Sequence, residues 1–401
     1  MTDYAGAVHS AVEPAHSPLM PTYNPPKVEF VRGEGAHLFD GDGKRHLDFL
    51  SGLAVTSLGH AHPAVAEAVA VQATRLLHVS NLFGTEHNQP VATELDRLIG
   101  DGTPLGGQVF FCNSGAEANE AAIKLARRHG GPGRHVVVCA FQSFHGRTLA
   151  TLAATGQPQK WDAFQPLPEG FRHVIWNDLE ELEKNLDETV GAVFLEPVQG
   201  EGGVNPATAE YFQGVQALCR ERGILFMVDE VQTGLARTGR WFGFQHFGVD
   251  PDVVAMAKAL GNGMPIGACW AKAEVAASFS PGDHATTYGG QPLATAAARA
   301  VLDTMVSIDA PRLAAEAGAA LSKAMLGLPQ VSGVRGLGML LALELEGVNA
   351  PAAAARCLEE GLVVNGVTPT ALRLAPPLII GDAEIAEAVS ILGPILDELA
   401  E

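Results

Sequence analysis

Between residues 90 and 293 the chain alternates short, almost wholly apolar runs with stretches of helical periodicity. The apolar runs lie at about residues 108–112, 135–140, 190–195, 224–228 and 251–257. Apolar runs without polar alternation are typical of strands in a mostly parallel sheet that helices cover on both faces. The sequence therefore predicts an α/β fold, in which ligands bind outside the carboxyl ends of the strands.

A lysine, Lys258, follows the last of these runs and precedes a glycine-rich segment. Desolvation shifts a lysine toward its neutral amine, and a neutral amine is a nucleophile for carbonyl groups. A lysine at a strand end is more often simply solvated, so Lys258 alone indicates little. Its interpretation depends on what else lies at the same edge of the predicted sheet.

Two further features are predicted at that edge. One apolar run ends in Asp229, and another leads into Ser114, which Glu117 follows three residues later. Ser114 and Glu117 match a capping box, so a helix should begin there with free N–H groups that bind anions. An amine, a carboxylate and an anion site together predict pyridoxal phosphate as the cofactor: its aldehyde would react with Lys258 and its ring nitrogen would pair with Asp229.

Charge and composition exclude several other classes of function. The 401 residues carry 45 acidic and 26 basic side chains, a formal charge of −19, whereas a nucleic-acid surface requires clustered lysine and arginine. No apolar stretch reaches the length of a membrane span and the first ten residues do not resemble a signal peptide, so we expect a cytoplasmic protein. We also expect no metal, because the five scattered cysteines and the pair His60 and His62 lack ligand spacing.

The length of the chain favours one large domain with a smaller partner. Residues 1–62 should form an N-terminal arm and a small antiparallel segment, and residues 63–293 the large cofactor-binding domain. Residues 294–401 change to alanine-rich helices and short strands. Because neither end is large enough to fold alone, both ends should join in one α+β domain.

Residues on predicted loops supply further candidates. Phe144 could stack on a flat ring, and Arg147 could bind a carboxylate through two hydrogen bonds. Arg373 lies among apolar residues, and a buried guanidinium needs an acidic partner, for which Glu201 is a candidate. Thr287 could donate to a phosphate. Taken singly, each also fits an ordinary role as a core aromatic, a solvated charge or a turn hydroxyl.

Seven motifs occur in the order found in the class III aminotransferases, and from about Leu19 onward the chain resembles that family. The motifs are Asn113-Ser-Gly-Ala-Glu-Ala-Asn-Glu, Phe144-His-Gly-Arg-Thr, Glu196-Pro-Val-Gln-Gly-Glu-Gly-Gly, Asp229-Glu-Val-Gln-Thr-Gly, Ala257-Lys-Ala-Leu-Gly, Thr286-Thr-Tyr-Gly-Gly and Arg373-Leu-Ala-Pro-Pro-Leu. The resemblance implies a fold-type I transferase dependent on pyridoxal 5'-phosphate, with a mostly parallel sheet in a large domain and a smaller α+β domain. It also implies a homodimer with shared active sites.

The resemblance assigns expected roles to individual residues. Lys258 would hold the cofactor covalently and move the substrate proton, and Asp229 would pair with the ring nitrogen. Arg373 would bind the α-carboxylate of 2-oxoglutarate, and Glu201 would cover Arg373 while the amine donor is bound. Arg147 would bind a substrate carboxylate. The other expected cofactor contacts are Gln232 to the ring hydroxyl, Phe144 stacked on the ring, and Ser114, Gly115, Ala116 and the partner subunit's Thr287 around the phosphate.

The expected reaction is transfer of the terminal amine of N2-acetylornithine to 2-oxoglutarate, giving N-acetylglutamate 5-semialdehyde and glutamate, a step of arginine biosynthesis. Ornithine, succinyl-diaminopimelate and 4-aminobutyrate are alternative donors, and an aminomutase or racemase of the same fold is a further alternative. Arg147 and Arg373 with Glu201 favour a dicarboxylic second substrate, which an isomerase does not need. Gly84 and the pair Thr56-Ser57 depart from the family pattern near the substrate end, so they bear on the identity of the amine.

Overall fold

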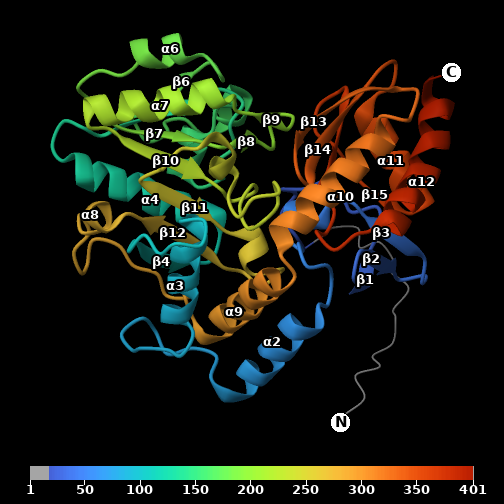
Figure 1. The fold of residues 1–401 in the computed structure, drawn as a ribbon, viewed down its shortest axis with the longest axis horizontal. Coiled ribbons are helices and arrows are strands. Elements are labelled where there is room, and N and C mark those ends of the chain that lie inside the picture. The colour runs from blue at the N-terminus through green and yellow to red at the C-terminus, as the bar shows by residue number, and fades with distance from the viewer. Residues whose placement is uncertain (1–17, 401) are drawn as a thin grey trace.

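The computed structural model describes residues 18–400, so most of the predicted N-terminal arm lies outside the described residues. Figure 1 shows a larger lobe around a central sheet and a smaller lobe where the first strands lie beside the last helices. Helices α2 and α9 extend below the larger lobe in this view. The two lobes are described in turn because the candidate residues come from both.

The larger lobe is built on a seven-stranded sheet in the order β4-β12-β11-β10-β7-β5-β6. Its strands are β4 (Gln108–Cys112), β5 (Val136–Ala140), β6 (Phe171–Val174), β7 (Val190–Leu195), β10 (Leu225–Asp229), β11 (Val253–Met256) and β12 (Gly267–Ala271). Strand β12 runs antiparallel to β11 and β4, and the other neighbouring strands pair in parallel. The mostly parallel α/β fold predicted from the sequence is therefore confirmed.

The five inner strands of this sheet, β5, β7, β10, β11 and β12, are buried on both faces. In β10, Leu225 and Met227 pack into one apolar cluster with helix α4, while Phe226 and Val228 pack into the second cluster. Adjacent strand residues point to opposite faces, so each face needs its own cover. This explains why the sequence of β10 is continuously apolar instead of alternating.

Helices alternate with strands in the larger lobe, as the sequence predicts, and further helices lie in the smaller lobe. Their bounds are α2 (Pro63–Arg75), α3 (Asn88–Ile99), α4 (Gly115–Gly130), α5 (Leu149–Ala154), α6 (Leu179–Lys184), α7 (Ala209–Arg222), α9 (Pro292–Ser307), α10 (Ala310–Met325), α11 (Ala350–Glu360) and α12 (Asp382–Ala400). Capping sets several of these ends. Helix α7 begins where Thr208 accepts from Tyr211 N and ends at Gly223 in the left-handed conformation.

The smaller lobe contains two four-stranded sheets. The first has the order β1-β2-β3-β15 and the second β13-β14-β17-β16. Their strands are β1 (Phe30–Glu34), β2 (His37–Asp40), β3 (Arg45–Asp48), β13 (Val331–Leu337), β14 (Leu340–Leu345), β15 (Leu362–Val363), β16 (Asn365–Gly366) and β17 (Ala371–Leu374). Strand β15 pairs in parallel with β3, so segments from both halves of the chain share one sheet. The domain boundaries at 62/63 and 293/294 stay a proposal, and the second falls in the first turn of α9.

The described residues contain neither a membrane-spanning helix nor a cluster of metal ligands. Between residues 18 and 400, no helix combines the length and apolar character needed to cross a bilayer. His60 lies in the motif that resembles a metal site, and its Nε2 is 2.7 Å from Asp48 Oδ2. Over the same range, no group of three or more His, Cys, Asp or Glu side chains is placed to hold a metal.

Candidate active site

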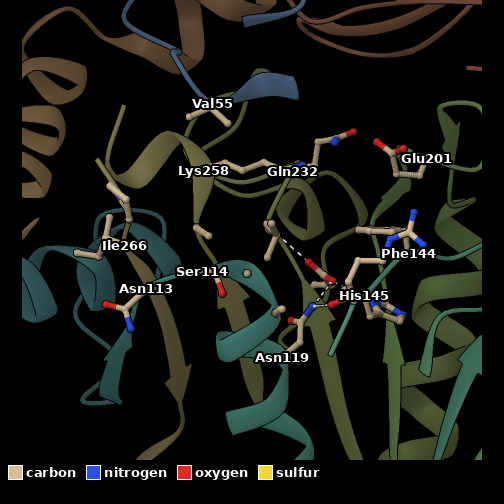
Figure 2. Close-up of a pocket in the computed structure, with 18 of the residues that line it drawn as sticks. Val55, Asn113, Ser114, Asn119, Phe144, His145, Glu201, Gln232, Lys258 and Ile266 are labelled. Atoms are coloured by element: carbon tan, nitrogen blue, oxygen red, sulfur yellow. Dashed lines mark hydrogen bonds and ion pairs between the residues drawn. The ribbon is translucent and has the colours of Figure 1, made fainter. Parts of the chain in front are cut away.

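A cavity of about 390 Å³ lies at the edge of the central sheet where β4, β10 and β11 end (Figure 2). Small-molecule sites typically have volumes of about 300–1,000 Å³, so a ligand of the size of pyridoxal phosphate fits this range. The predicted site residues that line the cavity are Ser114, Gly115, Ala116, Phe144, Arg147, Glu201, Asp229, Gln232 and Lys258. The structure thus brings together residues that are up to 144 positions apart in the chain (258 − 114).

Lys258 begins the short 3₁₀ helix η4 (Lys258–Leu260), which follows β11, and its side chain points into the cavity (Figure 2). Its backbone φ is +43°, a left-handed conformation that costs a residue with a side chain about 1 kcal/mol. Burial lowers the pKa of its amine to about 8, although the negative charge of Glu201 acts in the opposite direction. No described residue forms a hydrogen bond or ion pair with Nζ, so the amine is available to a ligand.

Asp229 ends β10 and is held by three donors. Its Oδ2 accepts from Asn119 Nδ2 at 2.8 Å and lies 2.8 Å from His145 Nδ1, and its Oδ1 accepts from Val231 N at 2.9 Å. The carboxylate is only 4% exposed, so these donors replace the water that a buried negative charge would lose. His145 is itself fixed by stacking on Phe194, with ring centres 4.5 Å apart.

Sequence reasoning missed the roles of Asn119 and His145. Both lie inside motifs quoted above, directly beside residues that were assigned a function. Asn119 is on the buried face of α4, where an amide needs a partner, and this was the available signal. Their contacts to Asp229 show that they orient the carboxylate toward the cavity.

The start of helix α4 forms one wall of the cavity. Ser114 is the N-cap and accepts from Glu117 N at 3.2 Å, as the capping box predicts. The Glu117 carboxylate instead accepts from Asn113 N at 2.7 Å, one residue earlier than in a standard capping box. The N–H groups of Gly115 and Ala116 lie in the first turn, where no intrahelical acceptor exists, so they can bind an anion.

Arg373 and Glu201 form an ion pair beside the cavity. Arg373 is 2% exposed, and its Nη1 donates to Glu201 Oε1 at 2.5 Å. Its Nη2 donates to Asn365 Oδ1 at 2.9 Å, and Gln232 Oε1 lies 3.4 Å from Nη1. Burial tends to raise the pKa of Glu201, but the charge of Arg373 outweighs it and the pKa is lowered. Arg373 itself does not line the cavity, whereas its partner Glu201 does.

Phe144 and Glu196 also line the cavity. Glu196 is buried and its Oε2 accepts from Phe144 N at 3.1 Å. Burial and the nearby charge of Asp229 raise the pKa of Glu196 well above its ordinary value, which favours the protonated acid. The exposed Arg147 has its Cζ 5.4 Å from the centre of the Phe144 ring.

Thr287 is a predicted site residue that the structure does not bring to the cavity. It is exposed and does not line the cavity of its own chain. Its loop is fixed by Asn81, whose Nδ2 donates to Thr286 O and Gly289 O at 3.2 and 3.0 Å. Thr287 therefore stands on an outer surface, and its expected phosphate contact requires a second subunit.

Comparison with known proteins shows the family to which the chain is similar. The family described as Aminotransferase class-III matches residues 20–396. The acetylornithine aminotransferase of Gloeobacter violaceus is 47% identical over 390 residues, which cover 95% of this chain and 96% of that protein. The N-acetylornithine aminotransferase structure from Stenotrophomonas maltophilia has 34% identity and a TM-score of 0.81, covering 93% of this chain and 96% of that one. An ornithine aminotransferase structure from Toxoplasma gondii, with partial occupancy of PLP at its active site, has 32% identity and a TM-score of 0.88, covering 95% and 92%.

Proposed function

Because the chain belongs to the class III aminotransferases, which are enzymes dependent on pyridoxal phosphate, we propose that it transfers the terminal amino group of N2-acetylornithine to 2-oxoglutarate. The products are N-acetylglutamate 5-semialdehyde and glutamate, and the reaction belongs to arginine biosynthesis. The 47% identity to an acetylornithine aminotransferase over nearly the whole chain supports this donor.

The cavity residues fit the cofactor. Lys258 Nζ has no partner among residues 18–400 and a pKa lowered to about 8, so a neutral amine is available to bond the cofactor aldehyde. Asp229 presents a buried carboxylate suited to a protonated ring nitrogen. The free N–H groups of Gly115 and Ala116 suit its phosphate, together with the Ser114 hydroxyl. Phe144 offers an aromatic face, and Gln232 an amide for the ring hydroxyl.

Bound pyridoxal phosphate supplies a ring that withdraws electrons, which eases removal of a proton from the carbon beside the reacting nitrogen. The protein moves that proton. Lys258 Nζ, with its pKa near 8, takes the proton as a base and returns it as an acid near neutral pH. Asn119 and His145 hold the Asp229 carboxylate in the orientation that would face the ring nitrogen. Glu196 adds no second full charge beside Asp229, since its raised pKa favours the neutral acid.

The observation that carries the proposal is the buried ion pair between Arg373 and Glu201. The two substrates differ at this point, because 2-oxoglutarate has a carboxylate beside its reacting carbon and the terminal amine of N-acetylornithine has only a methylene group. With Glu201 in place the guanidinium is neutralised, which suits the methylene. If Glu201 moves aside, Arg373 can bind the carboxylate through two hydrogen bonds. One pocket then accepts both substrates in turn.

The acidic residues of the cavity also bear on the choice between N-acetylornithine and ornithine. In residues 18–400 the carboxyl groups that line it are Glu196, Glu201 and Asp229, and each already has a hydrogen-bond donor. Ornithine would bring an additional α-ammonium group that needs an acid of its own. An acetylated nitrogen carries no charge and makes no such demand. This supports the acetylated donor.

We propose further that two copies of the chain share their active sites. Thr287 lies outside its own cavity, which suits a contact with the partner's phosphate site. Around it the surface is apolar: Leu82, Phe83 and Tyr288 are 86, 68 and 68% exposed, and Asn81 ties the first two to the Thr287 loop. Exposed apolar side chains that gather at one place are typical of protein–protein interfaces, which supports this proposal. Analytical ultracentrifugation should give a dimer, and a monomer with full activity would contradict the shared site.

A cytoplasmic location is part of the proposal. All five cysteines are free and buried, which suits a reducing compartment.

Steady-state kinetics with 2-oxoglutarate test the donor directly. N-acetylornithine, ornithine, succinyl-diaminopimelate and 4-aminobutyrate are compared at equal concentrations, and glutamate formation is measured. The proposal expects the highest kcat/KM with N-acetylornithine. A higher kcat/KM with ornithine or another donor would replace it, and conversion of an amine without any oxoacid would indicate an isomerase.

A further inference from the structure

Two cationic side chains lie beside the Phe144 ring, which forms one wall of the cavity. Arg147 Cζ is 5.4 Å and Lys160 Nζ is 5.1 Å from the centre of that ring. Neither forms an ion pair with any residue from 18 to 400, although the chain has 45 acidic side chains and only 26 basic ones. Arg147 lines the cavity, and two unpaired cations beside one ring create a positive potential that attracts an anion.

The position of Lys160 is fixed by the chain around it. The short 3₁₀ turn η1 (Pro158–Lys160) follows Gly156, and Gly156 O accepts from Gln142 N at 2.7 Å. Gly156 N donates to Ser143 Oγ at 3.0 Å, and these bonds tie the segment to the turn that leads into Phe144. After the turn, Trp161 Nε1 donates to a backbone carbonyl of the same segment at 2.7 Å. Lys160 is therefore held beside the cavity wall by the same loop system that places the aromatic ring.

Lys160 has no acidic partner to offset its burial and the positive charge beside it. Its side chain is half-buried, and burial lowers the pKa of its ammonium, as does the like charge of Arg147. Glu201 acts in the opposite direction, but it is already paired with Arg373. A carboxylate placed between Lys160 and Arg147 would relieve their repulsion and replace the water that Lys160 has lost.

We propose that Lys160 joins Arg147 in binding the carboxylate that lies far from the reacting carbon in both substrates. In N-acetylornithine this group is the α-carboxylate, and in 2-oxoglutarate it is the γ-carboxylate. The inference rests on the proposed function and adds a second cation to the carboxylate site. Arg147 supplies a planar pair of donors, and Lys160 supplies a point charge on a flexible stem. The Arg373 site stays free for the carboxylate beside the reacting carbon.

Binding of glutarate, a dicarboxylate that cannot react, tests this role on the holoenzyme by titration calorimetry. The variant Lys160→Met keeps the length of the stem and removes the charge, and Lys160→Arg keeps the charge. Lys323→Met is the matched control, because Lys323 is exposed on α10 of the smaller lobe. We expect Lys160→Met to raise the dissociation constant about tenfold, the size of one charge-assisted contact, with Lys160→Arg and Lys323→Met within about twofold of the unchanged protein.

The donor half-reaction provides a second readout. Single turnovers are measured with N-acetylornithine and with its carboxamide, which has the same shape without the negative charge. Lys160→Met should lower kcat/KM about tenfold for the carboxylate through KM and leave the carboxamide unchanged. Glutarate binding equal to that of the unchanged protein would overturn the inference. So would an equal loss for both donors with a lower melting temperature, since a packing role predicts that result.

The two proposals can fail separately. If the unchanged enzyme does not convert N-acetylornithine, the proposed donor is wrong, and the glutarate titration still decides the role of Lys160. If the enzyme converts N-acetylornithine and Lys160→Met binds glutarate normally, only the role of Lys160 is wrong. Should Lys160→Met fail to fold, Lys160→Gln provides the same comparison.

Discussion

Replacing Glu201 with glutamine should reverse the balance between the two substrates. In the structure Glu201 Oε1 accepts from Arg373 Nη1 at 2.5 Å, and Arg373 is 2% exposed. A substrate carboxylate can bind Arg373 only after it displaces Glu201. In Glu201→Gln a neutral amide takes the place of the carboxylate, so the competing partner is weaker and the guanidinium is no longer neutralised.

The size of the effect follows from this one contact. A hydrogen bond to a charged group contributes about 1.5–3 kcal/mol, and about 1.4 kcal/mol corresponds to a tenfold change. Glutamate should therefore gain about tenfold to a hundredfold in kcat/KM, because its carboxylate no longer competes with Glu201. N-acetylornithine should lose activity, because its methylene group then faces a bare cation.

Single-turnover half-reactions provide the assay. The enzyme in its pyridoxal form is mixed with either amine, and the change in cofactor absorbance gives kcat/KM for each. Glu188→Gln is the matched control, since Glu188 is an exposed acid on the loop before β7. A ratio of the two kcat/KM values in Glu201→Gln that stays within about twofold of the unchanged enzyme would refute the switch between Glu201 and Arg373.

Three further predictions concern buried charges. Asp229→Asn leaves Asn119 and His145 without a charged acceptor. We expect kcat to fall about a hundredfold or more, while the circular dichroism spectrum shows that the fold is retained. A fall in kcat of less than about threefold would contradict the role of Asp229. Burial lowers the pKa of Lys258 from 10.5 to about 8. The rate at which the apoprotein takes up the cofactor, measured by absorbance, should therefore rise with pH up to about pH 8 and then level off. A rate that still rises up to pH 10 would indicate a lysine with an ordinary pKa. Burial raises the pKa of Glu230 from 4.5 to about 7, so the folded state binds more protons than the unfolded state between these values and the free energy of unfolding falls as pH rises through them. In Glu230→Gln, urea unfolding should show a decrease in the free energy of unfolding over this pH range that is about 3 kcal/mol smaller than in the unchanged protein. The same pH dependence in both proteins would contradict the raised pKa of Glu230.

Much of the larger lobe was predictable because its inner strands are apolar on both faces and because helices such as α4 and α7 begin at side-chain caps. Strand β12 was missed: Gly267–Ala271 is a short run of small residues around Trp270, directly after a glycine-rich loop, and carries little strand signal. It runs antiparallel between β11 and β4, where the Trp270 ring fills the core and its Nε1 donates to Asp96 Oδ1 at 2.9 Å. Its place depends on tertiary packing that no local pattern reveals.

The sequence predicts the reactive and charged side chains that follow the strands of the site. It does not reveal the residues that orient those side chains. Lys258 and Asp229 stand out as charges after apolar runs. Asn119 and His145 do not, because their partner is Asp229, 110 and 84 positions away. The ion pair of Arg373 with Glu201 was predictable, since a guanidinium among apolar residues requires an acid. Thr287 was predicted as a site residue from its motif alone. In the single chain it lies on an outer surface, outside the cavity.

The central claim is that Lys258 holds pyridoxal phosphate and that the enzyme uses it to accept an amine. The most direct test is the visible spectrum of the purified protein incubated with pyridoxal phosphate, recorded before and after N-acetylornithine is added without an oxoacid. The account predicts a yellow band that N-acetylornithine bleaches and that Lys258→Ala lacks, with Lys323→Ala unchanged. A colourless protein, or the same band in Lys258→Ala, would contradict it.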